Sequence, residues 1–261
     1  MNIPYKIEVH DNLISTAAHK NLWEHIQTLQ FCGTWLAAKE EIFTYSLSSP
    51  KNPYDWMVYQ SMGRAPQMHR VSLASDEAGL KAKSLPIYLL WKELNHLLGD
   101  KYELTGNPED MHSMLEIPNP IDTQLDPGWR AYINANYNSH AGHGGQGYVH
   151  RDTPLEYNDD KTVTMLYVAN TEWYPSWAGE VRFYPEDPTG SSGENQQFNI
   201  GEEQRRGYNV GWLDCGRVVS PVPGRLIIYD GRCLHGTTPT ASATANPSIK
   251  IAFRARRKFQ T

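Results

Sequence analysis

Two short segments of the chain carry side chains that could bind a metal ion together. His150 and Asp152 stand two residues apart in GQGYVHRDT, and His235 follows a strand-like run in PGRLIIYDGRCLH. On a β-strand, residues i and i+2 point to the same face, so the imidazole and the carboxylate could reach one ion. Two histidines and one carboxylate form the facial triad of non-haem Fe(II) oxygenases, which leaves coordination positions open.

Zinc is the alternative metal for such a site. It is more often held by three histidines, or by histidine and cysteine, in a tetrahedral arrangement. Cys32, Cys215 and Cys233 are far apart in the sequence and form neither a CxxC pair nor a disulfide framework. The pattern therefore favours iron over zinc. This use of cysteine is typical of a reducing compartment, and we expect a cytoplasmic location.

The elements that must position these residues fall into two parts. Ser15 can cap a helix that runs to about Gln30, and Ser84 precedes a second helix that Gly99 ends. From residue 129 onward, short runs rich in Tyr, Val, Ile and Thr alternate with turn residues, which is typical of an antiparallel sandwich or barrel. These runs are 130–138, 147–152, 162–169, 179–184, 217–222, 225–230 and 248–254.

This pattern predicts an α+β fold in one domain, 1–261. Residues 1–128 would form a helical and mixed support, and 129–261 the β-rich core. The polar, glycine-rich segment 185–211 reads as a loop inserted between strands. Pro223 and Gly224 would make the turn into the strand before His235.

Charge and length exclude some functions. The chain has 261 residues, 24 Lys+Arg and 29 Asp+Glu, with a formal net charge of −5. This charge gives no general attraction to phosphate backbones, so we expect no nucleic-acid partner. No apolar run approaches the roughly 20 residues that span a bilayer, and the N-terminus lacks a signal-peptide core, so we expect no membrane association.

Three ordered blocks of residues give the chain a resemblance to a known family. The segment 132–254 resembles the prolyl 4-hydroxylase branch of the 2-oxoglutarate/Fe(II)-dependent dioxygenases. The first block, of the type Y-x-x-G-x-x-Y-x-x-H-x-D, is matched by Tyr137 and by 147–152, with a few extra residues between. The second and third, Y-L-N-x-x-W with W-G-G-E and P-x-x-G-R-L-x-x-F-D-x-x-x-x-H, are matched by LYVANTEWYPSWAGE and VPGRLIIYDGRCLH.

The resemblance implies a double-stranded β-helix, or jelly-roll, core buttressed by the N-terminal helices. It implies that His150, Asp152 and His235 are the catalytic metal ligands for Fe(II). It also implies 2-oxoglutarate as co-substrate and O2 as oxidant, and ascorbate is a candidate additional cofactor. Ala178 stands where the family has the first glycine of W-G-G-E, a change that keeps the turn unless that position needs a positive φ.

The far carboxylate of 2-oxoglutarate pairs with a basic residue on a late strand in that family. In 248–254, alternation places Ser248, Lys250, Ala252 and Arg254 on one face of a strand. Lys250 lies 15 residues beyond His235, further than the usual spacing of about ten. We favour Lys250 for the carboxylate and keep Arg254 as the alternative, while Tyr137 is the matched tyrosine that would bind the same group.

The sequence therefore predicts an oxidoreductase that hydroxylates an unactivated C–H bond. A peptidyl proline is the leading substrate, and a small molecule or another protein side chain is the alternative. A catalytically silent jelly-roll that binds a ligand is a rival from another class, although a binding module has no need of all three predicted ligands. A zinc hydrolase of cupin-like shape lacks an evident further ligand or base. The motifs do not encode the oligomeric state.

Overall fold

The computed structural model describes residues 3, 5–34, 41–47, 68–74, 76–104, 131–136, 152, 162–185, 215–238, 240 and 247–258. For residues 32–34, 41–46, 68–70, 72 and 74 it describes the backbone alone. Two predicted site residues, Tyr137 and His150, lie outside the described residues.

A large antiparallel sheet forms the centre of the described structure. Its strands lie in the order β1-β10-β7-β12-β6-β4-β2-β3, and β5 also pairs with β12. Neighbours in the sheet come from distant parts of the chain, so N-terminal and C-terminal halves fold together. The strands are β1 (Ile7–His10), β2 (Gln30–Thr34), β3 (Glu41–Ser46), β4 (Met68–Ala74), β5 (Tyr102–Glu103), β6 (Ala131–Asn136), β7 (Thr162–Val168), β10 (Leu226–Asp230) and β12 (Ser248–Arg257).

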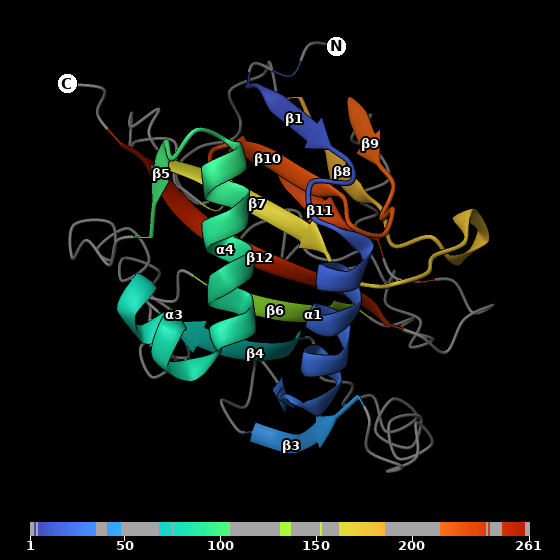
Figure 1. The fold of residues 1–261 in the computed structure, drawn as a ribbon. Helices are drawn as coiled ribbons and strands as arrows, with labels where there is room; N and C mark the ends of the chain where they lie inside the picture. Colours follow the sequence, from blue (N-terminus) through green and yellow to red (C-terminus); the bar gives the residue numbers. More distant parts are fainter. Residues whose placement is uncertain are drawn as a thin grey trace.

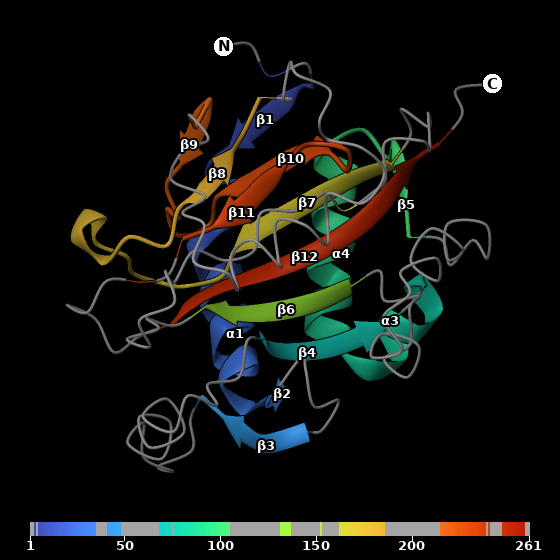
Figure 2. The same ribbon diagram turned by 180° about the vertical axis from the view of Figure 1, so that it is seen from behind.

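A smaller antiparallel sheet covers one face of the large one (Figure 2). It consists of β8 (Val181–Phe183), β9 (Arg217–Val219) and β11 (His235–Thr237), in the order β11-β8-β9. Side chains from both sheets form one apolar cluster, which shows that their inner faces pack together. Its members include Leu166, Ile227 and Tyr229 from the large sheet and Val181, Phe183 and Val219 from the small one.

Helices α1 (Thr16–Thr28) and α4 (Leu85–Leu97) cover the opposite face of the large sheet (Figure 1). Ser15 caps α1 by accepting a hydrogen bond from the Ala18 amide, as expected from the sequence. The apolar stripes of both helices are buried against the outer face of the sheet, where each large side chain contributes about 1.5–3 kcal/mol through burial. The core therefore has two parts, one on each side of the large sheet.

Successive side chains of strand β12 point alternately into these two parts of the core. Ile249, Ile251 and Phe253 belong to the cluster under the helices, while Ala252 belongs to the cluster between the sheets. Lys250 and Arg254 share the face of Ala252, as the sequence predicted. The site residues therefore face the space between the two sheets.

Some elements differ from the expectation. The N-terminal part is not only a support, because β1, β2, β3 and β4 extend the large sheet itself. Helix α1 ends at Thr28, since Gln30 begins β2. A short helix, α3 (Glu77–Lys83), precedes α4 and has only Leu80 buried, too little to give a periodic signal. No helix in the described part of the chain is long and apolar enough to cross a membrane.

Candidate functional site

Asp152 lies in a bend beside the end of β10, not in the strand predicted for 147–152. Its amide donates a hydrogen bond to the Gly231 carbonyl at 2.9 Å, and its side chain is buried. The remainder of 147–152 lies outside the described residues, so the sharing of one strand face by His150 and Asp152 stays a prediction. The position of Asp152 is set by the turn after β10.

His235 begins β11 and therefore belongs to the small sheet. The sequence placed it at the end of the strand 225–230, but Gly231 to Leu234 form a turn and a new strand starts at the histidine. His235 Nδ1 lies 2.9 Å from the Cys233 carbonyl. A carbonyl only accepts, so Nδ1 carries a proton, and in the neutral ring Nε2 then presents its lone pair to the space between the sheets.

Asp152 and His235 meet between the two sheets. Asp152 Oδ2 and His235 Nε2 are 3.6 Å apart, and both side chains are almost completely buried. Two donors that bind one ion at about 2.1 Å and at right angles would be about 3.0 Å apart, so a small movement suffices. The described residues hold no complete group of three His, Cys, Asp or Glu side chains that could bind a metal. The two donors present nevertheless fit the N/O chemistry expected of an iron site.

Among the described residues, three donors approach the Asp152 carboxylate. Arg254 Nη2 donates to Oδ1 at 2.6 Å, Thr164 Oγ1 to Oδ2 at 2.7 Å, and the Tyr229 hydroxyl lies 3.1 Å from Oδ2. The same hydroxyl lies 3.0 Å from His235 Nε2. The sequence did not single out Thr164 or Tyr229. One signal was available, because Tyr229 stands where the resembling family has Phe in its third block.

Burial and charge act together on these groups. Burial raises the pKa of Tyr229 well above its usual value, and the neighbouring Asp152 charge raises it further. Burial alone would lower the pKa of Arg254, but Tyr132 and Asp152 beside it raise that pKa above its usual value. Tyr229 therefore stays a protonated phenol and Arg254 a cation in the described structure.

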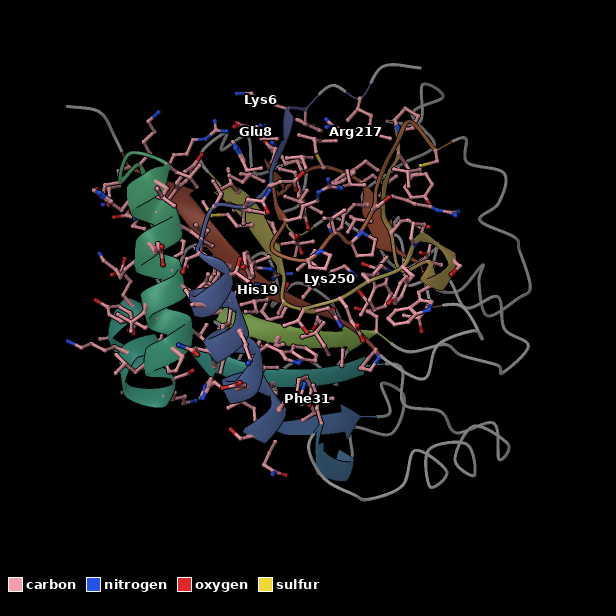
Figure 3. All side chains as sticks on the ribbon, turned by 45° about the vertical axis from the view of Figure 1, so that its right-hand side comes forward. Lys6, Glu8, His19, Phe31, Arg217 and Lys250 are labelled. Atoms are coloured by element: carbon pink, nitrogen blue, oxygen red, sulfur yellow. The ribbon has the colours of Figure 1, made fainter. Side chains whose placement is uncertain are left out.

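Lys250 is a second buried basic side chain (Figure 3), and alternation along β12 places it on the same face as Arg254. Its ammonium nitrogen donates to the Gly179 carbonyl at 3.0 Å and to Ser248 Oγ at 2.7 Å. Burial lowers the pKa of Lys250 to about 7, although the Glu180 charge acts in the opposite direction. Arg254 already pairs with the Asp152 carboxylate, whereas Lys250 bonds the neutral oxygens of Gly179 and Ser248. Lys250 is therefore the better candidate to receive an incoming carboxylate.

The segment after β7 forms an aromatic corner beside Lys250. Trp173 and Trp177 pack edge to face at 5.2 Å between ring centroids, and Trp173 Nε1 donates to the Ala178 carbonyl at 2.9 Å. Ala178 has φ +55° and ψ −140°, a backbone conformation that favours glycine. The corner therefore does have a positive φ at Ala178, in a residue other than glycine.

His19 is a buried histidine with a purely structural role. It lies on α1 under the outer face of the sheet, with Nδ1 2.6 Å from the Tyr167 hydroxyl and Nε2 2.9 Å from the Asn170 carbonyl (Figure 3). These bonds join α1 to β7 and to the segment that follows it, on the side opposite the site. The absence of any partner spacing around His19 in the sequence agrees with this structural role.

The fold and site together define an α+β protein with two packed antiparallel sheets and a buried His/Asp pair between them. No protein-family model and no curated protein matches the chain. Among solved structures, it is similar to a prolyl-4-hydroxylase from Pseudomonas putida, with 11% identity over 98% of this chain and 95% of that one and a TM-score of 0.40.

Two further structures are similar at the same level. HygX from Streptomyces hygroscopicus, with nickel and 2-oxoglutarate bound, shares 12% identity over 98% of this chain and 85% of its own, with a TM-score of 0.49. The α-ketoglutarate-dependent epimerase SnoN from nogalamycin biosynthesis shares 10% identity over 96% of this chain and 77% of its own, with a TM-score of 0.48. Such identities, with TM-scores below 0.5, do not establish a family for this chain.

Proposed function

We propose that this protein is an Fe(II)- and 2-oxoglutarate-dependent dioxygenase with a double-stranded β-helix core. The observation that carries the proposal is the meeting of Asp152 and His235 between the two sheets, with the buried cation Lys250 on the same inner face. A buried carboxylate beside an imidazole, together with a buried lysine that bonds neutral oxygens, has little use in a packing core. They suit a site that takes up a metal and a dicarboxylate.

The metal would be held by His150, Asp152 and His235. His235 supplies Nε2 because its Nδ1 proton is held by the Cys233 carbonyl. Asp152 supplies Oδ2, the oxygen nearer to His235. When bound, the iron supplies the activation of O2 that couples decarboxylation of 2-oxoglutarate to hydroxylation of the substrate.

The co-substrate carboxylate would bind Lys250, with Tyr137 as a second donor and Arg254 as the alternative cation. The overall reaction converts substrate C–H, 2-oxoglutarate and O2 into substrate C–OH, succinate and CO2. The packed inner faces of the two sheets serve this chemistry because they exclude water around the reacting groups.

A peptidyl proline is the substrate class we propose, on the strength of the three blocks matched in 132–254. A small molecule or another side chain is the alternative with the same chemistry. We also propose a cytoplasmic location and no nucleic-acid or membrane partner, in keeping with the net charge of −5 and the cysteine pattern.

Anaerobic titration with Fe(II) and 2-oxoglutarate tests the reaction class. The complex should show a weak visible charge-transfer absorption that the zinc form lacks, and admission of O2 should yield succinate. Absence of both from the wild-type protein would overturn the dioxygenase proposal and leave the binding-module alternative. Turnover of a peptide library, read by mass spectrometry as a gain of one oxygen on proline, tests the substrate class.

Two alanine variants test the assignment of the cation. At saturating Fe(II), Lys250→Ala should weaken 2-oxoglutarate binding far more than Arg254→Ala does, because Arg254 is already paired with Asp152 at 2.6 Å. Binding can be followed anaerobically through the same absorption band. The reverse order would move the carboxylate site to Arg254.

A further inference from the structure

The three donors to Asp152 stand in one row across the large sheet. The register pairs Arg254 of β12 with Thr164 of β7, and Thr164 with Tyr229 of β10. Cross-strand partners point to the same face of a sheet, so the three side chains lie side by side on the inner face. Residues separated by up to 90 positions in the sequence thus converge on one carboxylate.

Each donor approaches a defined oxygen of Asp152. Arg254 holds Oδ1 at 2.6 Å, while Thr164 at 2.7 Å and Tyr229 at 3.1 Å bond Oδ2. An ionised carboxylate only accepts hydrogen bonds, and bonds to a charged acceptor are strong. The carboxylate is therefore fixed in rotation by donors on both oxygens before any ligand arrives.

Tyr229 has a second function in this row, because it also reaches His235. Its hydroxyl is 3.1 Å from Asp152 Oδ2 and 3.0 Å from His235 Nε2. The phenol has one proton, and both of these atoms can accept it, since the His235 proton lies on Nδ1. With Nε2 engaged by a metal ion, the proton of Tyr229 would bond Asp152 alone. Without a metal ion, the Tyr229 hydroxyl thus links Asp152 and His235. With a metal ion bound, it orients Asp152 alone.

Aromatic packing keeps Tyr229 in this position. Its ring lies 4.7 Å from the His235 ring and 5.1 Å from the Phe183 ring, centroid to centroid. The side chain is 1% exposed. A rigid ring leaves the hydroxyl little freedom to move away from its two partners.

We propose that Arg254, Thr164 and Tyr229 are positioning residues that hold Asp152 as a one-oxygen metal ligand. This inference rests on the proposed function. Because Arg254 occupies Oδ1, the carboxylate presents only Oδ2 toward His235. A carboxylate held in this way takes one coordination position rather than two, and so leaves room for a chelating co-substrate and O2.

Mn²⁺ binding to the purified protein tests this role without any turnover. Free Mn²⁺ is measured by electron paramagnetic resonance for wild type, Thr164→Val, Thr164→Ser and Tyr229→Phe. Loss of an outer hydrogen bond to a metal ligand costs about 10- to 100-fold in metal affinity, so the Val and Phe variants should bind correspondingly more weakly. Thr164→Ser keeps the hydroxyl donor and should restore most of the affinity.

Tyr167→Phe is the matched control for the tyrosine. Tyr167 is equally buried and also bonds a histidine, His19, but it lies on the outer face of the same sheet. Its variant should lose thermal stability to a similar degree as Tyr229→Phe and keep wild-type Mn²⁺ affinity. Melting temperatures of all variants, measured without metal, separate loss of folding from loss of metal binding.

The outcomes distinguish the positioning role from the proposed function. Wild-type protein that binds no Mn²⁺ would overturn both. Wild-type binding with equal affinity in Thr164→Val and Tyr229→Phe would overturn the positioning role alone, as would a Thr164→Ser variant as weak as Thr164→Val. An intense visible band of the ferric protein that disappears in Tyr229→Phe would also overturn it, because Tyr229 would then be a ligand itself.

Discussion

Replacement of Lys250 by methionine should make the protein more stable near neutral pH. The side chain is 2% exposed, and burial lowers its pKa to about 7 in the folded protein against 10.5 for an ordinary lysine. At about 1.4 kcal/mol per pH unit, that difference corresponds to a cost of about 5 kcal/mol for the buried charge. Methionine fills a similar volume and removes this cost. It also removes two hydrogen bonds of about 1 kcal/mol each, so a net gain of about 2 to 3 kcal/mol remains.

The stability gain of Lys250→Met should decrease as the pH rises above 7. Below pH 7, Lys250 is protonated in both the folded and the unfolded chain, so the wild type bears the full cost. Between pH 7 and 10.5, the unfolded chain holds a proton that the folded protein lacks, so wild-type stability rises with pH. The advantage of Lys250→Met should therefore fall by about 2 to 3 kcal/mol between pH 7 and pH 9.

Urea unfolding followed by tryptophan fluorescence, at several values between pH 6 and pH 9, measures this difference. Lys20→Met, on the exposed side of α1, is the control, and its difference from the wild type should stay constant. A Lys250→Met protein that is less stable than wild type at pH 6.5, or a difference that does not change with pH, would refute the reasoning. The same variant should lose 2-oxoglutarate binding, so stability and function would change in opposite directions.

Three further changes have expected effects on stability. Ala178→Gly should raise the free energy of unfolding by about 1 kcal/mol, since Ala178 has φ +55° and glycine adopts this conformation without strain; a lower melting temperature would contradict this. Phe253→Ala should cost about 3–5 kcal/mol in urea unfolding, because Phe253 is fully buried against Trp91 at 5.4 Å; a cost below 1 kcal/mol would mean that the site collapses without a cavity. Asp11→Asn should cost less than about 1 kcal/mol at pH 7, since the Asp11 pair with Arg225 is partly exposed. The Arg225 hydrogen bond lowers the pKa of Asp11, so this contribution is fully present above pH 3.8 and is lost as the pH falls through the lower folded value; thermal melting at low pH should show the two proteins converging.

Local pattern predicted much of the architecture. The stripes of α1 and α4 and the cap at Ser15 depend on residues three or four positions apart, which the sequence displays directly. The alternation in β12 likewise predicted that Lys250 and Arg254 share the face opposite Phe253. The turn at Gly224, with φ +74°, followed from its residue type.

Pairing between distant strands was beyond the reach of local pattern. Strand β1 has the half-polar sequence IEVH and becomes a strand through its antiparallel pairing with β10. His235 was expected at a strand end and instead begins β11, because its partner Phe183 lies in another sheet. Such long-range partners decide whether a short segment becomes a strand.

The sequence by itself indicated which side chains have the chemistry to bind a metal, because this follows from residue type, and the family resemblance added 2-oxoglutarate as an expectation. Only the tertiary structure decided how the two cations on β12 differ: Arg254 is paired with Asp152, while Lys250 bonds the Gly179 carbonyl and Ser248. It also brought Thr164 and Tyr229 to the same carboxylate. The physical reason is register, since a hydrogen bond between strands depends on which residues stand opposite one another, and that is set by the packing of the whole sheet.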